Sequence, residues 1–280
     1  MAFVSSLEMI KKAQEGKYAV PAFNAENLEM VQAIIAAAEE ANSPVMIQTT
    51  PPTAKYLTLE AMVAMTGALA KKAKVPVALH LDHCSNFDNV MKALRAGYTS
   101  VMIDGSKLPF EENIALTKRV VEAAKPMDVT VEAELGTVGG KEDNVSAGIA
   151  YTDVDEAVTF VQKTGVDIFA VAIGTAHGFY KGEPKLDFDR LSAIRERIGT
   201  PLVLHGGSGV PDEKVKETIR RGMCKVNFAT ELRAAATKAV RGALTDEAII
   251  DPKKFMGPAR DAVKALCLEK IEVCGSANKA

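Results

Sequence analysis

Three of the four histidines in this sequence stand at or just after the end of a short apolar run: His83, His177 and His205. A single histidine in such a place is more often a hydrogen-bonded structural residue than a metal ligand. Three that the fold brings to one place would form the ligand set of a catalytic zinc ion, with one position open for substrate. His80 lies two residues before Asp82, so a strand would turn both to the same face. We expect His80 to support Asp82, or to be a buried structural histidine, and not to bind metal.

Carboxylates accompany these histidines at Asp82, Asp104, Glu132, Glu134 and Glu142. Next to a metal ion, a carboxylate can ligate it, orient a ligand histidine or move protons. Glu132 and Glu134 have the same parity on one apolar run, so both can face one interior, and we expect at least one of them to be structural. Glu142 follows a pair of glycines, which is the composition of a mobile lid. The alternative for Glu142 is a solvated charge in the sequence KED.

Two segments late in the chain could bind phosphate. HGGSG (205–209) and NFAT (227–230) each lead into an expected helix. Glycines let backbone N–H groups approach an anion, and helix N-termini favour it. GGSG alone is more often a turn, but barrels commonly bind phosphate after strands seven and eight. Gly178, directly after His177, could add another backbone contact.

Lysine is absent from the places where a Schiff base would form. No lysine stands near the carboxyl end of an apolar run, and Lys225 opens the last run at the opposite end. A Schiff-base mechanism therefore lacks its nucleophile. The electron sink for carbanion chemistry would have to be a metal ion.

The elements that must position these residues alternate along the chain. Eight short apolar runs have the character of buried strands: 19–24, 44–50, 76–83, 100–105, 130–136, 168–174, 202–207 and 225–230. Helical patterns occur at 28–41, 59–73, 87–97, 113–125, 155–165, 191–199 and 212–222, and a last helix is expected from Gly257 to Val273. This alternation predicts an α/β fold, a single (β/α)8 barrel domain over residues 1–280 with a C-terminal helical extension.

A doubly wound open sheet is the alternative fold. It usually has fewer strands and a glycine-rich nucleotide loop after the first one, whereas here the first run ends in Asn24-Ala25-Glu26-Asn27. In a barrel, the carboxyl ends of all strands converge on one face, where active sites are built. That convergence would bring the histidines and the acids together. The longest irregular stretch is expected at 136–152.

Composition argues against several functions. The net charge of −2 gives no bulk attraction to nucleic acid or to an anionic membrane, and the lack of tryptophan argues against a base-stacking surface. No stretch approaches about 20 uncharged apolar residues, so we expect no membrane span. The N-terminus lacks the apolar region of a signal peptide. The four cysteines form no CxxC pair, so we expect a cytoplasmic protein.

With these residues assembled, the chain resembles the class II, zinc-dependent ketose-bisphosphate aldolases from near residue 3 to its C-terminus. The resemblance is carried by YAVPAFN, SPVMIQT, LHLDHC, SVMIDGS, VEAELGTVGG-x-ED, AIGTAHG, PLVLHGGSG and KVNFATE. It implies a TIM barrel that reversibly cleaves fructose or tagatose 1,6-bisphosphate to dihydroxyacetone phosphate and glyceraldehyde 3-phosphate through a zinc-stabilised enediolate. It also implies a homodimer or a homotetramer.

The resemblance further implies a role for each matching residue. Asp82 would exchange the proton of the C4 oxygen, and Glu142 would exchange the C3 proton of dihydroxyacetone phosphate. The zinc ligands would be His83, His177 and His205, and a second, weaker metal position would use Asp104 and Glu134. The dihydroxyacetone-phosphate site, where a monovalent cation (Na⁺ or K⁺) can also bind, matches Gly178, Gly206, Gly207, Ser208, Asn227, Ala229 and Thr230, and the pocket lining matches Asn24, Gln48 and Thr50.

Departures from the family pattern leave the substrate open. Many fructose-bisphosphate members have asparagine where Ala229 stands, phenylalanine where Cys274 stands and arginine where Lys253 stands. The forms KVNxATE, AIGTAHG and CGSAN look closer to the tagatose branch, and HGGSG and GEPKLDF closer to the fructose branch. The stereochemistry at C4 and the partner of the second phosphate therefore stay open.

Three other functions remain as alternatives. One is an aldolase of the same family that acts on another phosphorylated ketose. Another is a metal-dependent barrel hydrolase, which would be expected to carry an HxH pair on an early strand; the first strand has none. The last is a non-catalytic barrel that binds a sugar phosphate, for which neither Asp82 nor Glu142 would be needed.

Overall fold

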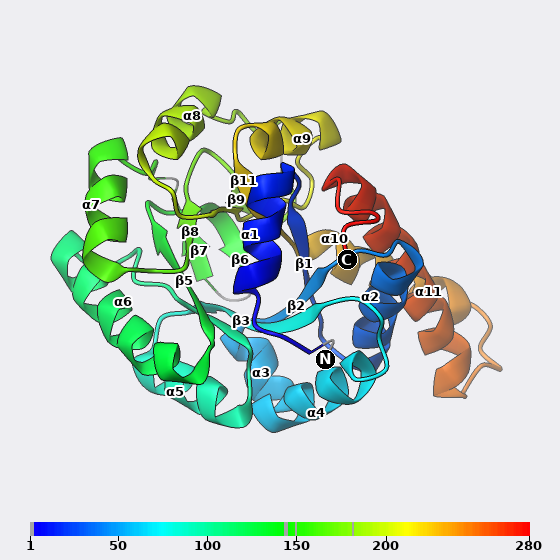
Figure 1. Cartoon of the computed structure of the whole chain (residues 1–280). Coiled ribbons are helices and arrows are strands. Elements are labelled where there is room, and N and C mark those ends of the chain that lie inside the picture. The colour runs from blue at the N-terminus through cyan, green and yellow to red at the C-terminus, as the bar shows by residue number, and fades with distance from the viewer. Residues whose placement is uncertain (1–2, 143–144, 149, 181) are drawn as a thin grey trace.

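Eight parallel strands close into a barrel at the centre of the computed structural model, which describes residues 3–142, 145–148, 150–180 and 182–280 (Figure 1). The barrel strands are β1 (Val20–Asn24), β2 (Val45–Thr49), β3 (Val77–Cys84), β4 (Ser100–Ile103), β5 (Thr130–Leu135), β8 (Ile168–Val171), β10 (Leu202–Leu204) and β11 (Met223–Phe228). They pair in this order around the barrel, and β11 pairs with β1 to close it. Each of the eight apolar runs contributes one strand, so the barrel prediction is confirmed and the open sheet is wrong.

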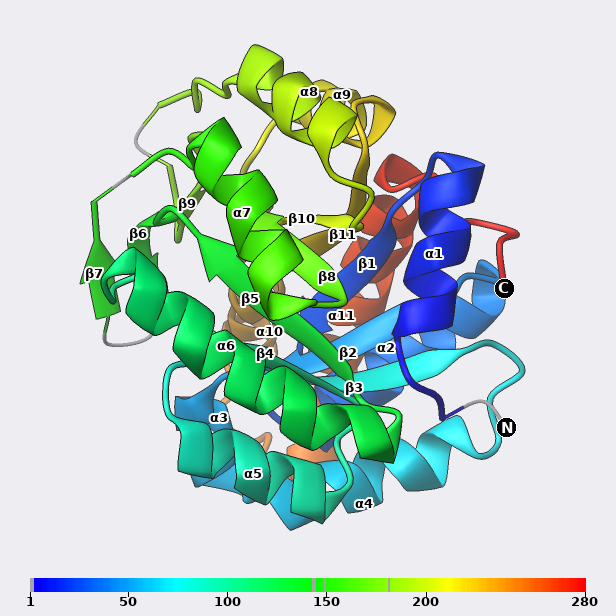
Figure 2. The ribbon, with the colours of Figure 1, turned by 60° about the vertical axis from the view of Figure 1, so that its left-hand side comes forward.

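Helices surround the barrel (Figure 2). Those that the sequence patterns predicted are α2 (Leu28–Glu40), α4 (Leu59–Ala70), α5 (Phe87–Ala96), α6 (Phe110–Ala124), α7 (Val154–Thr164), α8 (Phe188–Arg197), α9 (Asp212–Arg220), α10 (Thr230–Ala243) and α11 (Pro252–Val273). α11 begins before Gly257 because the Asp251 side chain caps the N–H of Lys253, and it continues through Pro258. α11 packs against α2 and α10.

One helix that the patterns did not predict closes the amino-terminal end of the barrel. This helix, α1 (Leu7–Gly16), buries Met9, Ile10 and Ala13 against an apolar layer inside the barrel that includes Val20 and Met46. Figure 1 shows α1 lying across the barrel opening. Two further short segments were not predicted, the helix α3 (Pro51–Leu57) and the 3₁₀ turn η1 (Lys125–Met127). The barrel is therefore closed by apolar side chains at one end, and its interior can be reached from the other.

The sequence suggested that residues 136–152 are irregular, but part of this stretch forms strands. It contains β6 (Gly139–Glu142) and β7 (Val145–Ala147), which pair antiparallel, and β6 also pairs in parallel with β9 (Ala176–His177). Figure 2 places this small sheet at the end of the barrel opposite α1. The register sets Gly140 opposite His177. A Cβ on Gly140, where φ is +87°, would overlap the carbonyl oxygen of His177, so glycine is required for this close approach.

The described helices give no candidate for a membrane span, because each is too short or too polar to cross a bilayer.

Candidate active site at the carboxyl ends of the barrel strands

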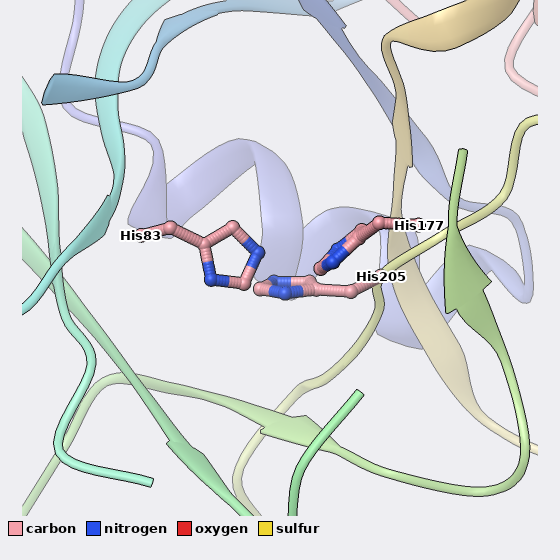
Figure 3. A group of neighbouring side chains, drawn as sticks. All are labelled: His83, His177 and His205. Atoms are coloured by element: carbon pink, nitrogen blue, oxygen red, sulfur yellow. The ribbon is translucent and has the colours of Figure 1, made fainter. Parts of the chain in front are cut away.

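The three histidines singled out in the sequence meet at the open end of the barrel. The ring centroid of His83 lies 4.8 Å from that of His177 and 4.4 Å from that of His205. One ring nitrogen from each of the three lies within 4.8 Å of the other two. Figure 3 shows the ring of His83, on β3, facing the rings of His177, on β9, and His205, just after β10.

His83 reaches this cluster through an irregular backbone. Neighbouring strand residues normally point to opposite faces, yet Asp82 and His83 both contribute to the site. The pairing of β3 with β4 shifts register between Leu81 and Cys84, and His83 has a φ of +47°. A bulge of this kind re-aims a side chain. It is the reason that two adjacent residues can serve one site.

Two glutamates of β5 hold His205. The Nε2 atom of His205 lies 2.7 Å from Glu132 Oε1, and its Nδ1 atom lies 3.1 Å from Glu134 Oε2. Burial and the charge of His83 lower the pKa of His205, but the two carboxylates outweigh them and raise it to about 9. The two glutamates thus share one histidine from opposite sides of its ring.

Asp104 adds a third carboxylate to the group. Its Oδ2 lies 3.1 Å from His83 Nδ1, and its Oδ1 accepts hydrogen bonds from the backbone N–H and the hydroxyl of Ser106 at 3.0 and 2.6 Å. Burial raises the pKa of Asp104, but the bonds to His83 and Ser106 prevail and hold it well below its usual value. Ligand atoms of His83, Asp104 and Glu134 also lie within 4.8 Å of one another. An oxygen-rich position therefore adjoins the three histidines.

Asp82 is buried near the histidines and accepts hydrogen bonds from two side-chain amides. Gln48 Nε2 and Asn227 Nδ2 lie 3.1 and 3.3 Å from its two oxygens. Gln48 Nε2 also donates to Asn24 Oδ1 at 2.7 Å. Burial raises the pKa of Asp82, but the nearby positive charges, chiefly those of His83 and Lys225, outweigh burial and bring it below its usual value. The group therefore carries a negative charge at neutral pH and can accept a proton.

Two cavities open beside the histidines. The larger has a volume of about 510 Å³. It is lined by two of the histidines, by two carboxylates and by residues of the loops after β2 and β4, among them His83, His177, Asp104, Glu134, Thr50 and Lys107. The smaller is lined by Asn24, His177, Gly178, Gly206, Ser208, Asn227, Ala229, Thr230 and Arg233. His177 lines both, so the two cavities meet at the histidine cluster.

The comparisons with known proteins settle the family. Residues 4–279 match the family model described as "Fructose-bisphosphate aldolase class-II". The chain belongs to this family. It is an aldolase, a lyase that acts on carbon–carbon bonds, and the family as a whole depends on a metal ion. The earlier resemblance is thereby confirmed at the level of family and reaction class.

Relatives and solved structures agree over the full length. The chain is 48% identical to the "Fructose-bisphosphate aldolase" of Geobacillus stearothermophilus over 100% of this chain and 99% of that protein. It is also 48% identical to the "Probable fructose-bisphosphate aldolase" of Bacillus subtilis (strain 168), with 100% of each covered. The crystal structure of the YdjI aldolase from Escherichia coli K12 shares 37% identity over 99% of each chain, with a TM-score of 0.89. A "putative fructose-1,6-biphosphate aldolase" from Coccidioides immitis shares 30% identity over 98% of this chain and 97% of that one, with a TM-score of 0.91.

The class II aldolase site contains buried polar atoms that the protein does not satisfy with hydrogen bonds. Among the described residues, four such atoms lie around the cluster, Asn24 Nδ2, Gln48 Oε1, His80 Nε2 and Asn227 Oδ1, while Glu134 Oε2 and His205 Nδ1 face each other at 3.1 Å without hydrogen-bond geometry. Each atom left in this way costs about 1–3 kcal/mol. Imidazole nitrogen and carboxylate oxygen are zinc ligands, and amides suit the hydroxyl groups of a sugar. The donor set therefore fits a metal ion with a polar ligand beside it.

The structure brings together most of the residues predicted from the sequence. Of the expected phosphate residues, all but Gly207 line the smaller cavity, and Gly207 forms its backbone turn, where a Cβ would come within 2.7 Å of Asn227 O. His80 lies below Asp82, with its Nδ1 2.8 Å from Ser100 Oγ and its Nε2 3.7 Å from Asp82 Oδ1. Glu142 ends β6, and its side chain lies outside the part of the chain that is described.

Three cations near the site were not anticipated. Lys225 does not open its strand, because β11 begins at Met223, and its Nζ lies 2.8 Å from Glu132 Oε2 inside the barrel. Its spacing of two from Asn227 could have revealed this position, since both residues then face the same side. Arg233, on the first turns of α10, and Lys107, after β4, line the two cavities, and no sequence motif marks either one.

Proposed function

We propose that this class II aldolase reversibly cleaves fructose 1,6-bisphosphate into dihydroxyacetone phosphate and glyceraldehyde 3-phosphate, with a zinc ion held by His83, His177 and His205. The observation that carries the proposal is the meeting of these three imidazoles beside a buried, ionised Asp82. The printed names of the relatives support fructose as the ketose. When bound, zinc supplies Lewis-acid polarisation of the substrate's carbonyl and adjacent hydroxyl oxygens.

Asp82 moves the proton of the C4 hydroxyl in this proposal. The amides of Gln48 and Asn227 each donate to one carboxylate oxygen, which fixes the orientation of the group. The pKa of Asp82 lies below its usual value, so the carboxylate is ready to take the proton as the C3–C4 bond breaks. Glu142 is proposed to exchange the C3 proton, from a strand whose Gly140 lies beside His177.

The smaller cavity is proposed to bind the phosphate of dihydroxyacetone phosphate. Gly178 and Gly206 give close access to the backbone, and Ser208 Oγ accepts a hydrogen bond from Ala229 N at 3.1 Å, just before α10 begins. An anion there is favoured by the N-terminus of this 14-residue helix. A sodium or potassium ion beside the phosphate is part of the same proposal.

The larger cavity is proposed to hold the rest of the substrate and its second phosphate. Of the residues that line it, Lys107 is the only lysine or arginine. It forms no ion pair with any described residue, and its charge is available to a ligand. Thr50 and Ser85 line the same cavity and can donate hydroxyl hydrogen bonds. Asp104 and Glu134 are proposed as a second, weaker metal position next to the first.

Tagatose 1,6-bisphosphate, or another phosphorylated ketose, is the alternative substrate. Ala229 lines the smaller cavity where a polar side chain would stand in many fructose-bisphosphate members, and this departure favours testing both epimers. The metal-dependent hydrolase gains no support, since β1 carries no histidine. We further propose that the whole chain is one domain, that it forms a homodimer or homotetramer and that it acts in the cytoplasm.

The substrate assignment is tested by a direct assay. Fructose and tagatose 1,6-bisphosphates are supplied in turn to the zinc-loaded protein, and triose phosphate formation is measured. We expect cleavage of both, with the larger kcat/KM for fructose 1,6-bisphosphate. A larger ratio for the tagatose epimer would reverse the choice of substrate, and cleavage of neither would contradict the proposal.

A further inference from the structure

A lysine lies in the core of the barrel, between the apolar layer at the amino-terminal end and the histidine cluster. The side chain of Lys225 has no exposed surface, and β11 places it two residues before Asn227 of the site. Burying an ammonium group is unfavourable unless a partner compensates for the lost hydration. An apolar side chain here could extend the layer that already contains Val20, Met46 and Val203. The charge at this position therefore calls for an explanation beyond packing.

The partner of Lys225 leads directly to the proposed zinc site. Lys225 Nζ lies 2.8 Å from Glu132 Oε2, and Glu132 Oε1 lies 2.7 Å from His205 Nε2. His80 Nε2 approaches the same Glu132 Oε2 at 3.5 Å. Both oxygens of this buried carboxylate are therefore held, one by the ammonium and one by the imidazole. With Nε2 occupied by Glu132, the Nδ1 atom of His205, which lies 3.1 Å from Glu134 Oε2, is the ring nitrogen left for a metal ion.

We propose that Lys225 is a positioning residue for the metal ion: it anchors Glu132, and Glu132 in turn fixes the ring of His205 with Nδ1 toward the metal position. Ligand histidines commonly depend on such a partner at their second nitrogen, and its loss typically lowers metal affinity about 10–100-fold. The carboxylate can orient the ring only if its own rotamer is fixed. Lys225 provides the second point that fixes it.

A direct catalytic role for Lys225 is disfavoured by its place in the fold. Neither of the two site cavities is lined by Lys225, and the site lies between it and the opening of the barrel. A lysine that forms a Schiff base must reach the substrate carbonyl as a free amine. Lys225 instead donates to a carboxylate in the core. The inference rests on the proposed metal site, and it concerns affinity rather than chemistry.

The test is the zinc affinity of Lys225→Met, measured by competition with a chromophoric chelator, with folding checked by circular dichroism. We expect binding at least about tenfold weaker than in the wild-type protein. Tyr98→Phe is the matched control, because it deletes another buried polar group, whose hydroxyl lies 2.9 Å from Thr49 Oγ1 away from the cluster. This control should lose stability and keep its zinc affinity.

The double variant Glu132→Gln/Lys225→Met separates positioning from simple charge compensation, and it decides the matter if the single variant fails to fold. It leaves no unpaired charge at these two positions, and the introduced amide oxygen can still accept a hydrogen bond from His205. If Lys225 only neutralises Glu132, the double variant is stable and binds zinc as tightly as Glu132→Gln alone, and the inference is wrong. If Lys225 positions the ring by fixing the side chain at position 132, the double variant folds but binds zinc at least about tenfold more weakly than Glu132→Gln alone. A wild-type protein that binds no zinc would instead overturn the metal site itself.

Discussion

His83 follows Asp82 directly in β3, yet the two side chains serve one site instead of pointing to opposite faces of the strand. The register shift after Leu81 and the positive φ of His83 account for this arrangement. It gives one strand end two functions, a metal-ligand candidate and a proton acceptor, at adjacent positions. The division of roles between them can be tested one residue at a time.

Asp82→Asn should separate proton transfer from metal binding. The amide keeps the shape of the side chain but cannot accept the hydroxyl proton, so kcat should fall about 10²–10⁴-fold. Zinc affinity should stay within a few-fold of wild type, because Asp82 is not part of the three-histidine group. Asp88→Asn, on the exposed first turn of α5, is the control and should change neither quantity. Loss of zinc together with activity would contradict this assignment.

Gly140→Ala should impair the small sheet without unfolding the barrel. The added Cβ meets the His177 backbone at a residue whose φ is +87°, so β6 must move away from β9. We expect kcat to fall at least about tenfold, while the urea midpoint changes by less than the equivalent of about 1 kcal/mol. Gly148→Ala lies in the same segment with nothing within 4 Å of its added Cβ, and it should behave as wild type. Equal activities of the two variants would show that this contact has no role.

Part of this site could be predicted from the sequence, and part could not. Strand-end placement found the three histidines and Asp82, because a closed parallel barrel brings all carboxyl ends to one rim. The pairing of β6 with β9 could not be read from glycine-rich local sequence, since it joins segments more than 30 residues apart. Arg233 and Lys107 were not predicted for a similar reason: a basic residue outside any motif becomes part of a site only through the cavity that it borders.

His80→Gln should flatten the acid dependence of stability in the metal-free protein. Burial lowers the pKa of His80 to about 3, whereas an unfolded histidine titrates near 6.5. Below pH 6.5 the unfolded chain therefore binds a proton that the folded chain does not bind. The free energy of unfolding then falls as the pH drops toward 3. Removing His80 should reduce the slope between pH 6.5 and 5 by about one proton, or about 1.4 kcal/mol per pH unit. Urea unfolding at several pH values measures the slope, and an unchanged slope would contradict the prediction.

Lys107→Met should weaken the binding of the second phosphate alone. We expect the KM for the ketose bisphosphate to rise about tenfold, which corresponds to about 1.4 kcal/mol. The KM for a ketose that carries only the 1-phosphate should not change. Lys55→Met, on α3 and outside the larger cavity, is the matched control. Equal effects of Lys107→Met on both substrates would show that Lys107 does not contact the second phosphate.

The central claim is that three histidines hold one zinc ion on which cleavage depends. The most direct measurement is a zinc titration of the chelator-treated protein, with cleavage of fructose 1,6-bisphosphate followed at each addition. The structure predicts no activity without metal and full recovery near one zinc per chain, and His177→Ala should abolish this recovery. Undiminished cleavage in excess chelator, or trapping of a covalent adduct by borohydride, would contradict it.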